Sequence, residues 1–466
     1  MNTFLLRTAI LASLLLAALA PAAAADGDLL PGFGTDAEFP GMGFYPSPYA
    51  QGEDAYVQRV DGLPDGSLAL IGYMNTGGNV RRASVYRLTA AGYPDHDFGD
   101  AGLRTYPMPC ADAALADAAV DVGGRIWLAF RGCGDFIAYR LTTHGDMDTS
   151  LLGSGLVQIA FDLGGVNDDA VRRILPDGAG GLILAGNAAT ANGRHLALAH
   201  ITEAGLPQPG FGVNGTATVP VPEPSIRVLG LHRMADGRIV AVGDFAPNPT
   251  LSVLMLARVQ ASGVPDAGFG NHGPGVSRAD MSALLGQGGS AVRHRASLLD
   301  RDGAVLVAGD TSYGVNVSAD FTLVKWRADG QLDQGIGAHG FRRYALDFAG
   351  PDPMNSDYNN DSAYLLQRQG DGKLVLAGQS RADDGHMGLS LLRLRRDLTP
   401  DPQFGSLGRV RHVVPLDPGG NHSAAVGALL LQPGRILVAG QVDIGPAMMQ
   451  MAMALENDLL FADTFD

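Results

Sequence analysis

The sequence predicts an all-β protein folded as a seven-bladed β-propeller, with four antiparallel strands in each blade. Two repeated motifs carry this prediction. In the first, a turn signal precedes a run of β-branched or Leu residues and usually a Gly, and it occurs seven times along the chain. The second motif ends in Phe-Gly and follows the first at regular intervals. Repeated sheets of this kind are typical of propellers.

The first motif is clearest at residues 236–243, which read Asp-Gly-Arg-Ile-Val-Ala-Val-Gly. Its apolar residues are consecutive rather than alternating, which indicates a strand with both faces buried. The other copies are residues 65–72, 123–130, 177–186, 302–309, 371–378 and 433–440. Successive copies are 54 to 69 residues apart, with a mean of about 61. This period is longer than that of solenoid repeats and fits a four-stranded blade.

The second motif reads Gly-Val-Pro-Asp-Ala-Gly-Phe-Gly at residues 263–270. In the second unit, at residues 145–153, we expect Leu152 to replace the Phe. One copy opens the chain at residues 27–34, and a last copy at residues 458–465 ends it. We therefore expect the two ends of the chain to meet and to close the ring, with a strand around residues 42–46 beginning the first unit.

Four strands are predicted in each unit, and residues 212–270 show them well. They are residues 216–221, 226–232, 239–242 and 253–259. A single sheet cannot cover both faces of its apolar strand, so the blades must pack on one another around an axis.

Residues 1–25 have the layout of a secretory signal peptide, with Arg7, an apolar run and small residues up to Ala25. We expect residues 26–466 to form one propeller domain that is secreted or periplasmic, whose last ten or so residues are a repeat remnant or a short tail. Without Arg7 the chain has 32 basic and 48 acidic residues, a net charge of −16. That charge argues against nucleic acid or anionic lipid as a partner. We expect a monomer that does not insert into membranes.

The only cysteines are Cys110 and Cys133, and they flank one predicted hairpin whose turn lies near residues 122–124. Folding the hairpin brings them opposite each other, and disulfides persist in exported proteins. We predict a disulfide between them. A metal site or a catalytic thiol has less support, because no second Cys or His pattern lies nearby.

Taken together, the two motifs resemble the delta-60 repeat of exported bacterial β-propeller proteins. The resemblance covers nearly all of the chain from Gly27 onwards. It implies the propeller fold but no settled activity, and it supplies no catalytic residues. The second unit departs most from the pattern, since Gly123 replaces Asp and Phe130 replaces the closing Gly.

The most irregular loop, residues 347–362, offers several oxygen ligands at alternate positions, as the start of a calcium loop does. The candidate calcium ligands are Asp352, Asp357, Asn359 and Asp361. Ser362 stands in place of the required Gly and Arg368 in place of the bidentate Glu, so no EF-hand is present. The alternatives are a calcium site and a solvated acidic loop, and no other cofactor is expected.

No catalytic constellation is visible in the sequence. It lacks a His-Glu-x-x-His motif and sialidase boxes, and Trp127 and Trp326 are expected to pack within the fold. His195 and His200 should point to opposite faces of a strand, which prevents them from sharing a ligand. Tyrosines near predicted loops remain candidates for stacking on a glycan. They are Tyr45, Tyr49, Tyr106, Tyr344 and Tyr358.

We therefore expect an exported, non-catalytic propeller that binds a protein, a glycan or a cation through loops at one mouth of the ring. The alternative is a hydrolase or lyase that acts on polysaccharide. Carboxylates from different blades, facing each other at the channel mouth, would distinguish this enzyme from a binding module.

Overall fold

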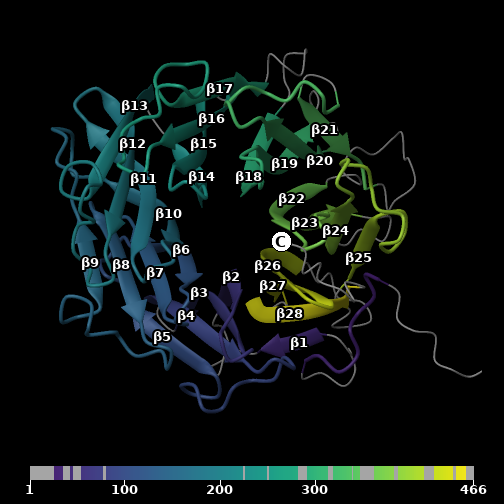
Figure 1. The fold of residues 1–466 in the computed structure, drawn as a ribbon. Helices are drawn as coiled ribbons and strands as arrows, with labels where there is room; N and C mark the ends of the chain where they lie inside the picture. Colours follow the sequence, from purple (N-terminus) through teal and green to yellow (C-terminus); the bar gives the residue numbers. More distant parts are fainter. Residues whose placement is uncertain are drawn as a thin grey trace, which may run out of the picture.

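The computed structural model confirms the predicted fold: 28 strands form seven four-stranded antiparallel sheets arranged in a ring (Figure 1). The residues that it describes are 26–34, 42–45, 54–76, 80–223, 226–248, 251–281, 291–312, 319–337, 340–346, 361–381, 387–413, 424–443 and 448–457. The predicted signal peptide and residues 458–466 lie outside these ranges. Among the described residues, no helix is both long enough and apolar enough to cross a membrane.

Each blade runs from an innermost to an outermost strand. The innermost strands are β2 (Asp54–Gly62), β6 (Ala114–Val120), β10 (Ala170–Pro176), β14 (Arg227–Arg233), β18 (Ala291–Leu299), β22 (Ser362–Arg368) and β26 (Ala424–Gln432). The second strands are β3 (Leu68–Thr76), β7 (Ile126–Arg131), β11 (Leu182–Thr190), β15 (Ile239–Asn248), β19 (Val305–Ser312), β23 (Leu374–Arg381) and β27 (Arg435–Asp443). These second strands are the seven apolar runs of the first motif.

The third strands are β4 (Val80–Leu88), β8 (Phe136–Leu141), β12 (Gly193–Ile201), β16 (Leu251–Val259), β20 (Ala319–Trp326), β24 (Met387–Leu394) and β28 (Met448–Glu456). The outermost strands are β5 (Leu103–Pro107), β9 (Leu156–Ile159), β13 (Thr216–Glu223), β17 (Val276–Asp280), β21 (Phe341–Tyr344), β25 (Arg409–His412) and β1 (Met42–Tyr45). We number the blades one to seven in chain order, from β2–β5 to the blade that contains β26–β28.

The ring closes where the two ends of the chain meet, as predicted. β1, the first strand of the chain, is the outermost strand of the last blade and pairs with β28, with Met42 opposite Met453 (Figure 1). The segment before β1 also joins this blade, since the Gly27 amide donates to the Glu456 carbonyl over 3.0 Å. Blade seven is therefore built from both ends of the described chain.

The sequence repeat and the blade are offset by one strand. The predicted unit at residues 212–270 begins with a strand that the structure assigns to the previous blade, because β13 pairs with β12. The repeat fixes the order of the strands along the chain, but it does not determine which neighbours form hydrogen bonds. The same offset makes β1 available to complete the last blade.

The hydrophobic core lies between the blades. It consists of seven clusters, and each cluster joins buried residues of two neighbouring blades. Val240 and Val242 of β15, for example, pack with Val305 and Val307 of β19. Trp127 and Trp326 are fully buried, which confirms their predicted packing role. The apolar second strands therefore hide both faces only because the next blade covers them.

The Phe-Gly segments join each blade to the next. Phe269 is 3% exposed, and the guanidinium of Arg258 lies 4.2 Å from the centre of its ring. Arg258 Nε donates to Asp266 over 2.7 Å, and its Nη1 donates to the carbonyl of Ala328 in the next blade over 2.6 Å. The repeated Phe, Asp and Arg residues therefore stabilise the junction between blades.

In blade two, the prediction that Leu152 replaces the Phe is wrong. Leu151 is fully buried at the Phe position, whereas Leu152 is 49% exposed and has a φ of 50°. Leu152 therefore stands where Gly99, with a φ of 60°, stands in blade one. Leu152 adopts the left-handed conformation that Gly adopts elsewhere, which is uncommon for a residue with a side chain.

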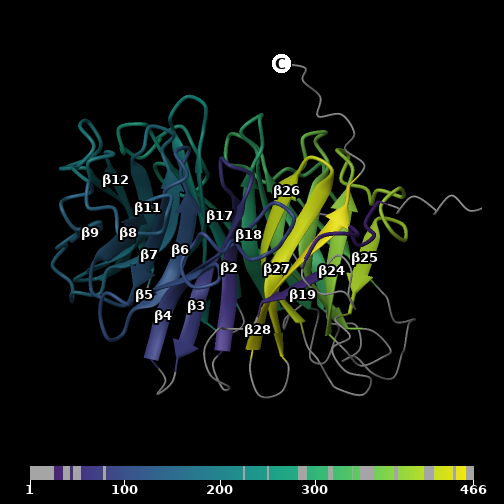
Figure 2. The same cartoon turned by 90° about the horizontal axis from the view of Figure 1, so that it is seen from below.

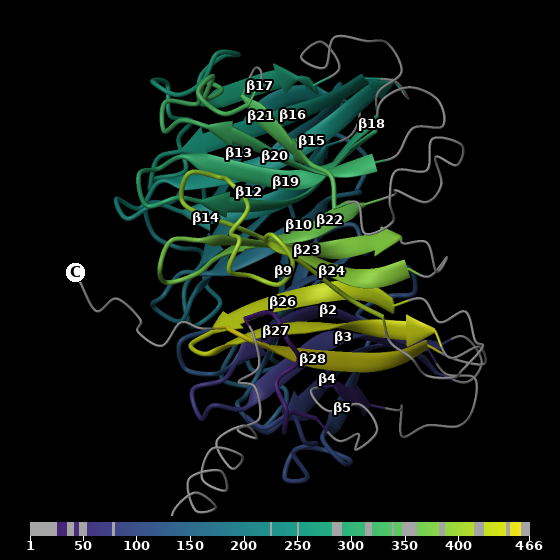
Figure 3. The same ribbon diagram turned by 90° about the vertical axis from the view of Figure 1, so that its right-hand side faces the viewer.

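The strands cross the thickness of the ring, so their connections gather on two faces (Figures 2 and 3). We call the first the turn face, because it carries the turns between innermost and second strands and the Phe-Gly segments. We call the second the loop face, because it carries the connections from each outermost strand to the next blade. The innermost strands begin at the loop face and end at the turn face.

Candidate functional site

Every innermost strand contains a β-bulge at the same position of its pairing with the second strand. The bulged residues are Gln58, Ala116, Arg172, Leu229, Arg295, Tyr364 and Gly427. A bulge leaves one residue out of the hydrogen-bonded ladder and redirects its side chain. All of these residues except Arg172 line a single cavity. We call these seven residues the bulge ring.

This cavity is the central channel of the propeller, and it has a volume of about 670 Å³. Residues from the innermost strands of all seven blades line it. The bulge ring differs from blade to blade, with amide, cationic, aromatic and aliphatic side chains. The residue just before each bulge is buried and mostly apolar, as Val57, Val171 and Val228 illustrate. The repeat therefore keeps the wall constant and varies the side chains that face the channel.

Aromatic and cationic side chains lie in the half of the channel near the loop face. The rings of Tyr56 and Tyr73 stack with their centres 4.7 Å apart. The Arg81 guanidinium lies 5.0 Å from the centre of the Tyr73 ring. Burial and the nearby Asp54 carboxylate raise the pKa of Tyr56, and the two side chains are joined by a hydrogen bond.

Across the channel, Arg295 of blade five lies against Tyr364 of blade six. The guanidinium carbon is 4.7 Å from the centre of the ring, and Arg295 Nε is 3.4 Å from the Asp310 carboxylate. The hydroxyl of Tyr364 donates to Gln379 Oε1 over 3.2 Å. These contacts fix two members of the bulge ring in place.

Nearer the turn face, the polar side chains of the channel bond to the backbone of the next blade. Asp117 Oδ2 accepts from the Ile174 amide over 2.9 Å. Gln367 Nε2 donates to the Leu429 carbonyl over 2.7 Å. Arg173 donates to the Leu229 carbonyl over the same distance. These side chains therefore hold the ring together.

Asp61 also belongs to this structural set. Its carboxylate pairs with Arg59 Nε over 2.9 Å and accepts from the Val120 amide of the next blade over 3.3 Å. Burial raises the pKa of Asp61, although the Arg59 guanidinium opposes this shift. Asp61 and Asp117 both serve the fold, so neither is a free carboxylate aimed at the channel.

His232 and Ser297 form a pair across blades four and five, with 2.8 Å between His232 Nε2 and Ser297 Oγ. Burial lowers the pKa of His232 to about 4, so the ring is neutral at pH 7. Within the described residues, no carboxylate forms an ion pair with His232. The pair therefore lacks the third group that orients the histidine of a catalytic triad.

Of the four candidate calcium ligands, Asp352, Asp357 and Asn359 lie outside the described residues. Asp361 is described and is 2% exposed. Its Oδ2 accepts from the Leu346 amide over 2.9 Å, and its own amide donates to the Ala319 carbonyl over 2.8 Å. The described part of the chain contains no group of three or more metal-binding side chains.

The tyrosines predicted to stack on a glycan are not those that line the channel. Tyr106 and Tyr344 are buried, and their hydroxyls donate to the carbonyls of Gly145 and Leu398 in the next blade over 2.7 and 2.8 Å. That prediction is wrong for both, because they fasten neighbouring blades together. Of the other three, Tyr49 and Tyr358 lie outside the described residues, and Tyr45 is placed only by its backbone pairing with Gln450.

A sequence signal for the bulge ring exists. In five blades the bulged residue lies seven positions before the first residue of the turn motif, as Tyr364 does before Asp371 and Arg295 before Asp302. Tyr73 directly follows the Gly that closes its apolar strand. Once the bulge is known, an alignment of the seven repeats identifies the positions of these channel residues.

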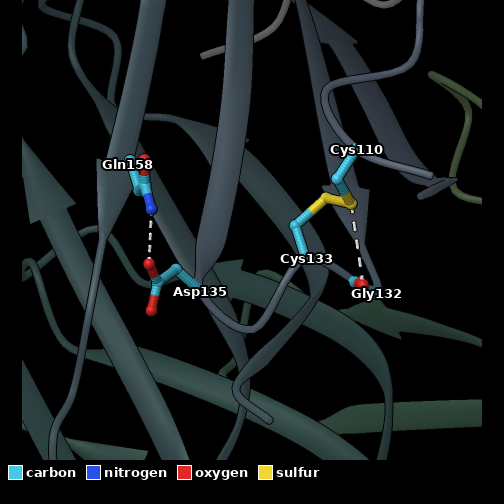
Figure 4. The surroundings of a disulfide bond; sticks show 5 residues. All are labelled: Cys110, Gly132, Cys133, Asp135 and Gln158. Atoms are coloured by element: carbon cyan, nitrogen blue, oxygen red, sulfur yellow. Dashed lines mark hydrogen bonds between the residues drawn. A yellow bond between two sulfur atoms is a disulfide. The ribbon is translucent and has the colours of Figure 1, made fainter. Parts of the chain in front are cut away.

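The disulfide between Cys110 and Cys133 is present, as predicted (Figure 4). Cys110 lies in the connection between β5 and β6, and Cys133 lies in the turn between β7 and β8. Both connections are on the loop face, beyond the end of the β6–β7 pair. Nearby, Gln158 Nε2 bonds to the Asp135 carboxylate (Figure 4).

The sequence matches a family described as "Domain of unknown function (DUF5122) beta-propeller" over residues 235–269 and 369–404. Each matched segment runs from one turn motif to the following Phe-Gly segment. The match supports a β-propeller family and covers two of the seven repeats. No curated protein matches the chain.

The chain is similar to several solved structures. A structure titled polysaccharide lyase Uly1 is 11% identical, with a TM-score of 0.51, and the match covers 93% of this chain and 98% of that one. An inactive virginiamycin B lyase from Staphylococcus aureus is 10% identical, with a TM-score of 0.45, covering 88% of this chain and 98% of the lyase. At such identities the likeness concerns the propeller fold alone.

Proposed function

We propose that this protein is an exported, non-catalytic binding module that takes a glycan into the loop-face half of its channel. The observation that carries the proposal is the bulge ring. Seven otherwise similar blades present six different residue types at this one position, and all of these residues except Arg172 line a cavity of about 670 Å³. Cavities of this size are usual for small-ligand sites, and sites in repeat folds lie where the repeats differ.

The side chains in this half of the channel match a sugar. Tyr73 and Tyr364 offer aromatic rings, on which the C–H face of a sugar can pack. Gln58 and Gln441 supply amides, and Arg295 supplies N–H donors for hydroxyl oxygens. A protein partner would be too large to enter the channel, and the described residues offer a cation no carboxylate cluster.

The enzymatic alternative has less support. A polysaccharide hydrolase needs two carboxylates that face each other across the substrate. Among the described residues that line the channel, Asp117 alone carries a carboxylate. This carboxylate accepts hydrogen bonds from the backbone amides of Ala118 and Ile174. The lyases of similar fold share about a tenth of their residues with this chain, which gives no reason to transfer their activity.

Three further inferences accompany this proposal. The predicted signal peptide and the disulfide between Cys110 and Cys133 support export to the periplasm or the cell exterior. The recurrence of both motifs in all seven units supports assignment of the repeat to the delta-60 type. We also propose that the protein acts as a monomer.

The test is a glycan array with the mature protein, followed by calorimetry on the glycans that bind. We expect Tyr73→Ala and Tyr364→Ala to weaken binding roughly tenfold or more, from the loss of a stacking contact. Tyr93→Ala is the matched control, because Tyr93 is 48% exposed and belongs to a turn-face Phe-Gly segment outside the channel.

The absence of any glycan ligand would contradict the proposal, as would an equal loss in the Tyr93 variant. Incubation of the protein with each bound polysaccharide tests the non-catalytic part. We expect no new reducing ends and no new ultraviolet absorbance from unsaturated sugars. Release of either product would favour the enzyme.

A further inference from the structure

We propose that a groove on the outside of the ring, between blades five and six, is a second binding site, for a saccharide that carries carboxylate or sulfate groups. The groove lies at the outermost strands β21 and β25, which Figure 1 labels. Its volume is about 480 Å³. Arg342 and Arg343 line it from blade five, and Arg395 and Arg409 line it from blade six. We call these four residues the arginine groove. It is separate from the channel.

No other junction between blades carries this set of residues. At the first junction the equivalent positions hold Arg104, Thr105, Thr142 and Leu156, and at the fourth they hold Ser277, Arg278, Arg327 and Phe341. At each of the other six junctions, two or fewer of these positions are arginine, and all of the positions lie in described residues. The fold therefore does not require arginine there, and a cluster at one junction indicates a separate role.

Two of the guanidiniums are already fixed in place. Arg342 Nη1 donates to the Leu398 carbonyl over 3.0 Å, and Arg409 Nη1 donates to the Leu346 carbonyl over 2.6 Å. A carbonyl holds the side chain but does not neutralise its charge. Within the described ranges, neither arginine forms an ion pair with a carboxylate. Their remaining N–H groups can therefore bind an oxyanion with little loss of side-chain entropy.

The charge of the groove contrasts with that of the chain. Arg343 pairs with Asp320, and Asp397 lies near the exposed Arg395, so the groove keeps an excess of positive charge. The whole chain has a formal charge of −15. A basic region on an acidic protein attracts an anionic ligand to that place alone and repels it elsewhere.

The rest of the lining favours a saccharide over an acidic peptide. Pro400, Pro402 and Leu407 also line the groove, and Leu407 is 64% exposed. Rigid proline rings and an aliphatic side chain suit the C–H face of a sugar ring, while the guanidiniums suit its acidic group. A flexible peptide would lose more conformational entropy on binding.

Binding measurements at low salt test this proposal. The ligands are polygalacturonate, heparin, dextran, poly-glutamate and inorganic phosphate. We expect polygalacturonate or heparin to bind and dextran to fail. Arg395→Gln should weaken that binding roughly tenfold, as the loss of a charge-assisted hydrogen bond does. Arg395 is exposed, so the variant should keep the wild-type melting temperature. Arg327→Gln is the matched control, because Arg327 holds the equivalent position in blade five and pairs with Asp329 outside the groove.

The polymer that binds more tightly identifies the acidic group as carboxylate or sulfate. Added salt should weaken the binding. Tyr364→Ala in the channel should leave the binding of the acidic polysaccharide unchanged, and this result would separate the arginine groove from the proposed glycan site. Three outcomes would overturn the proposal. They are no binding of either acidic polysaccharide, an equal loss in the Arg327 and Arg395 variants, and binding of poly-glutamate or phosphate alone.

Discussion

A Cβ atom placed on Gly145 would lie 2.6 Å from the ring of Phe98, which belongs to the preceding blade. The same contact recurs around the ring. It joins Gly92 to Phe33, Gly205 to Leu151, Gly263 to Phe211, Gly330 to Phe269 and Gly27 to Phe404. The last of these contacts joins the beginning of the described chain to blade six, so six of the seven junctions carry this packing. At the junction of blades five and six, Leu398, with a φ of 63°, stands in place of the glycine. The two repeated motifs therefore describe the junctions between blades as much as the blades themselves.

This contact predicts the cost of adding a methyl group. Gly145→Ala should destabilise the protein by about 3 kcal/mol, which combines the left-handed backbone with overpacking against Phe98. Gly178 has the same φ of 81°, but a Cβ there would meet no atom within 4 Å. Gly178→Ala should therefore cost only about 1 kcal/mol. Denaturant unfolding measures both values, and equal losses would show that the contact with Phe98 is unimportant.

A second prediction concerns acid stability. Burial opposes the ionisation of Asp266, but the ion pair with Arg258 outweighs it and holds the pKa of Asp266 below its ordinary value of 3.8. A lowered pKa in the folded state adds stability above pH 4, and this stability is lost as the pH falls through the folded value. Asp266→Asn should cost about 3 kcal/mol at pH 7, because it leaves Arg258 buried without its partner.

Melting curves between pH 2 and pH 7 test this, and the difference between wild type and Asp266→Asn should shrink below pH 4. Asp112→Asn, at an exposed position, is the control and should follow the wild type. A constant difference at every pH would contradict the assignment.

His232 predicts a separate pH window. Burial lowers the pKa of His232 from 6.5 to about 4. Between these two pH values the unfolded chain binds a proton at His232, whereas the folded chain does not. Stability should therefore fall as the pH is lowered from 6.5 to 4, and His232→Gln should flatten that part of the profile. Thermal unfolding across this range measures the effect. His144→Gln, at an exposed residue, should leave the profile unchanged, and an unaltered slope in the His232 variant would refute the prediction.

The disulfide should stabilise the protein because it lowers the conformational entropy of the unfolded chain. Replacing Cys110 and Cys133 by Ser should lower the free energy of unfolding by roughly 3 kcal/mol and leave the propeller intact. Reduction of the wild type should have the same effect, whereas the double variant should not respond to reductant. Denaturant titrations with and without reductant give the comparison, and a stabilised reduced protein would contradict it.

The sequence predicted the parts of the fold that repeat. Runs such as residues 239–242 are apolar on both faces, which only stacked blades can satisfy, and the matching motifs at both ends of the chain indicated ring closure. The disulfide followed from the position of Cys110 and Cys133 around one hairpin. These features depend on local patterns, and local patterns are visible in a sequence.

The channel residues could not be predicted in the same way. A bulge shifts the alternation of side chains by one residue, so the face that Tyr364 or Arg295 occupies does not follow from a simple strand pattern. Tyr106 and Tyr344 were candidates for stacking on a glycan, but the hydroxyl of each donates to a backbone carbonyl of the next blade. Leu151 was missed because the motif alignment placed Leu152 at the Phe position.

The central claim is that the bulge ring is where the ligand binds. A crystal structure with the best glycan from the array tests it most directly. We predict sugar density in the loop-face half of the channel, with a ring packed on Tyr73 or Tyr364 and hydrogen bonds to Arg295. Density on the turn face or the outer rim, with an empty channel, would contradict the account.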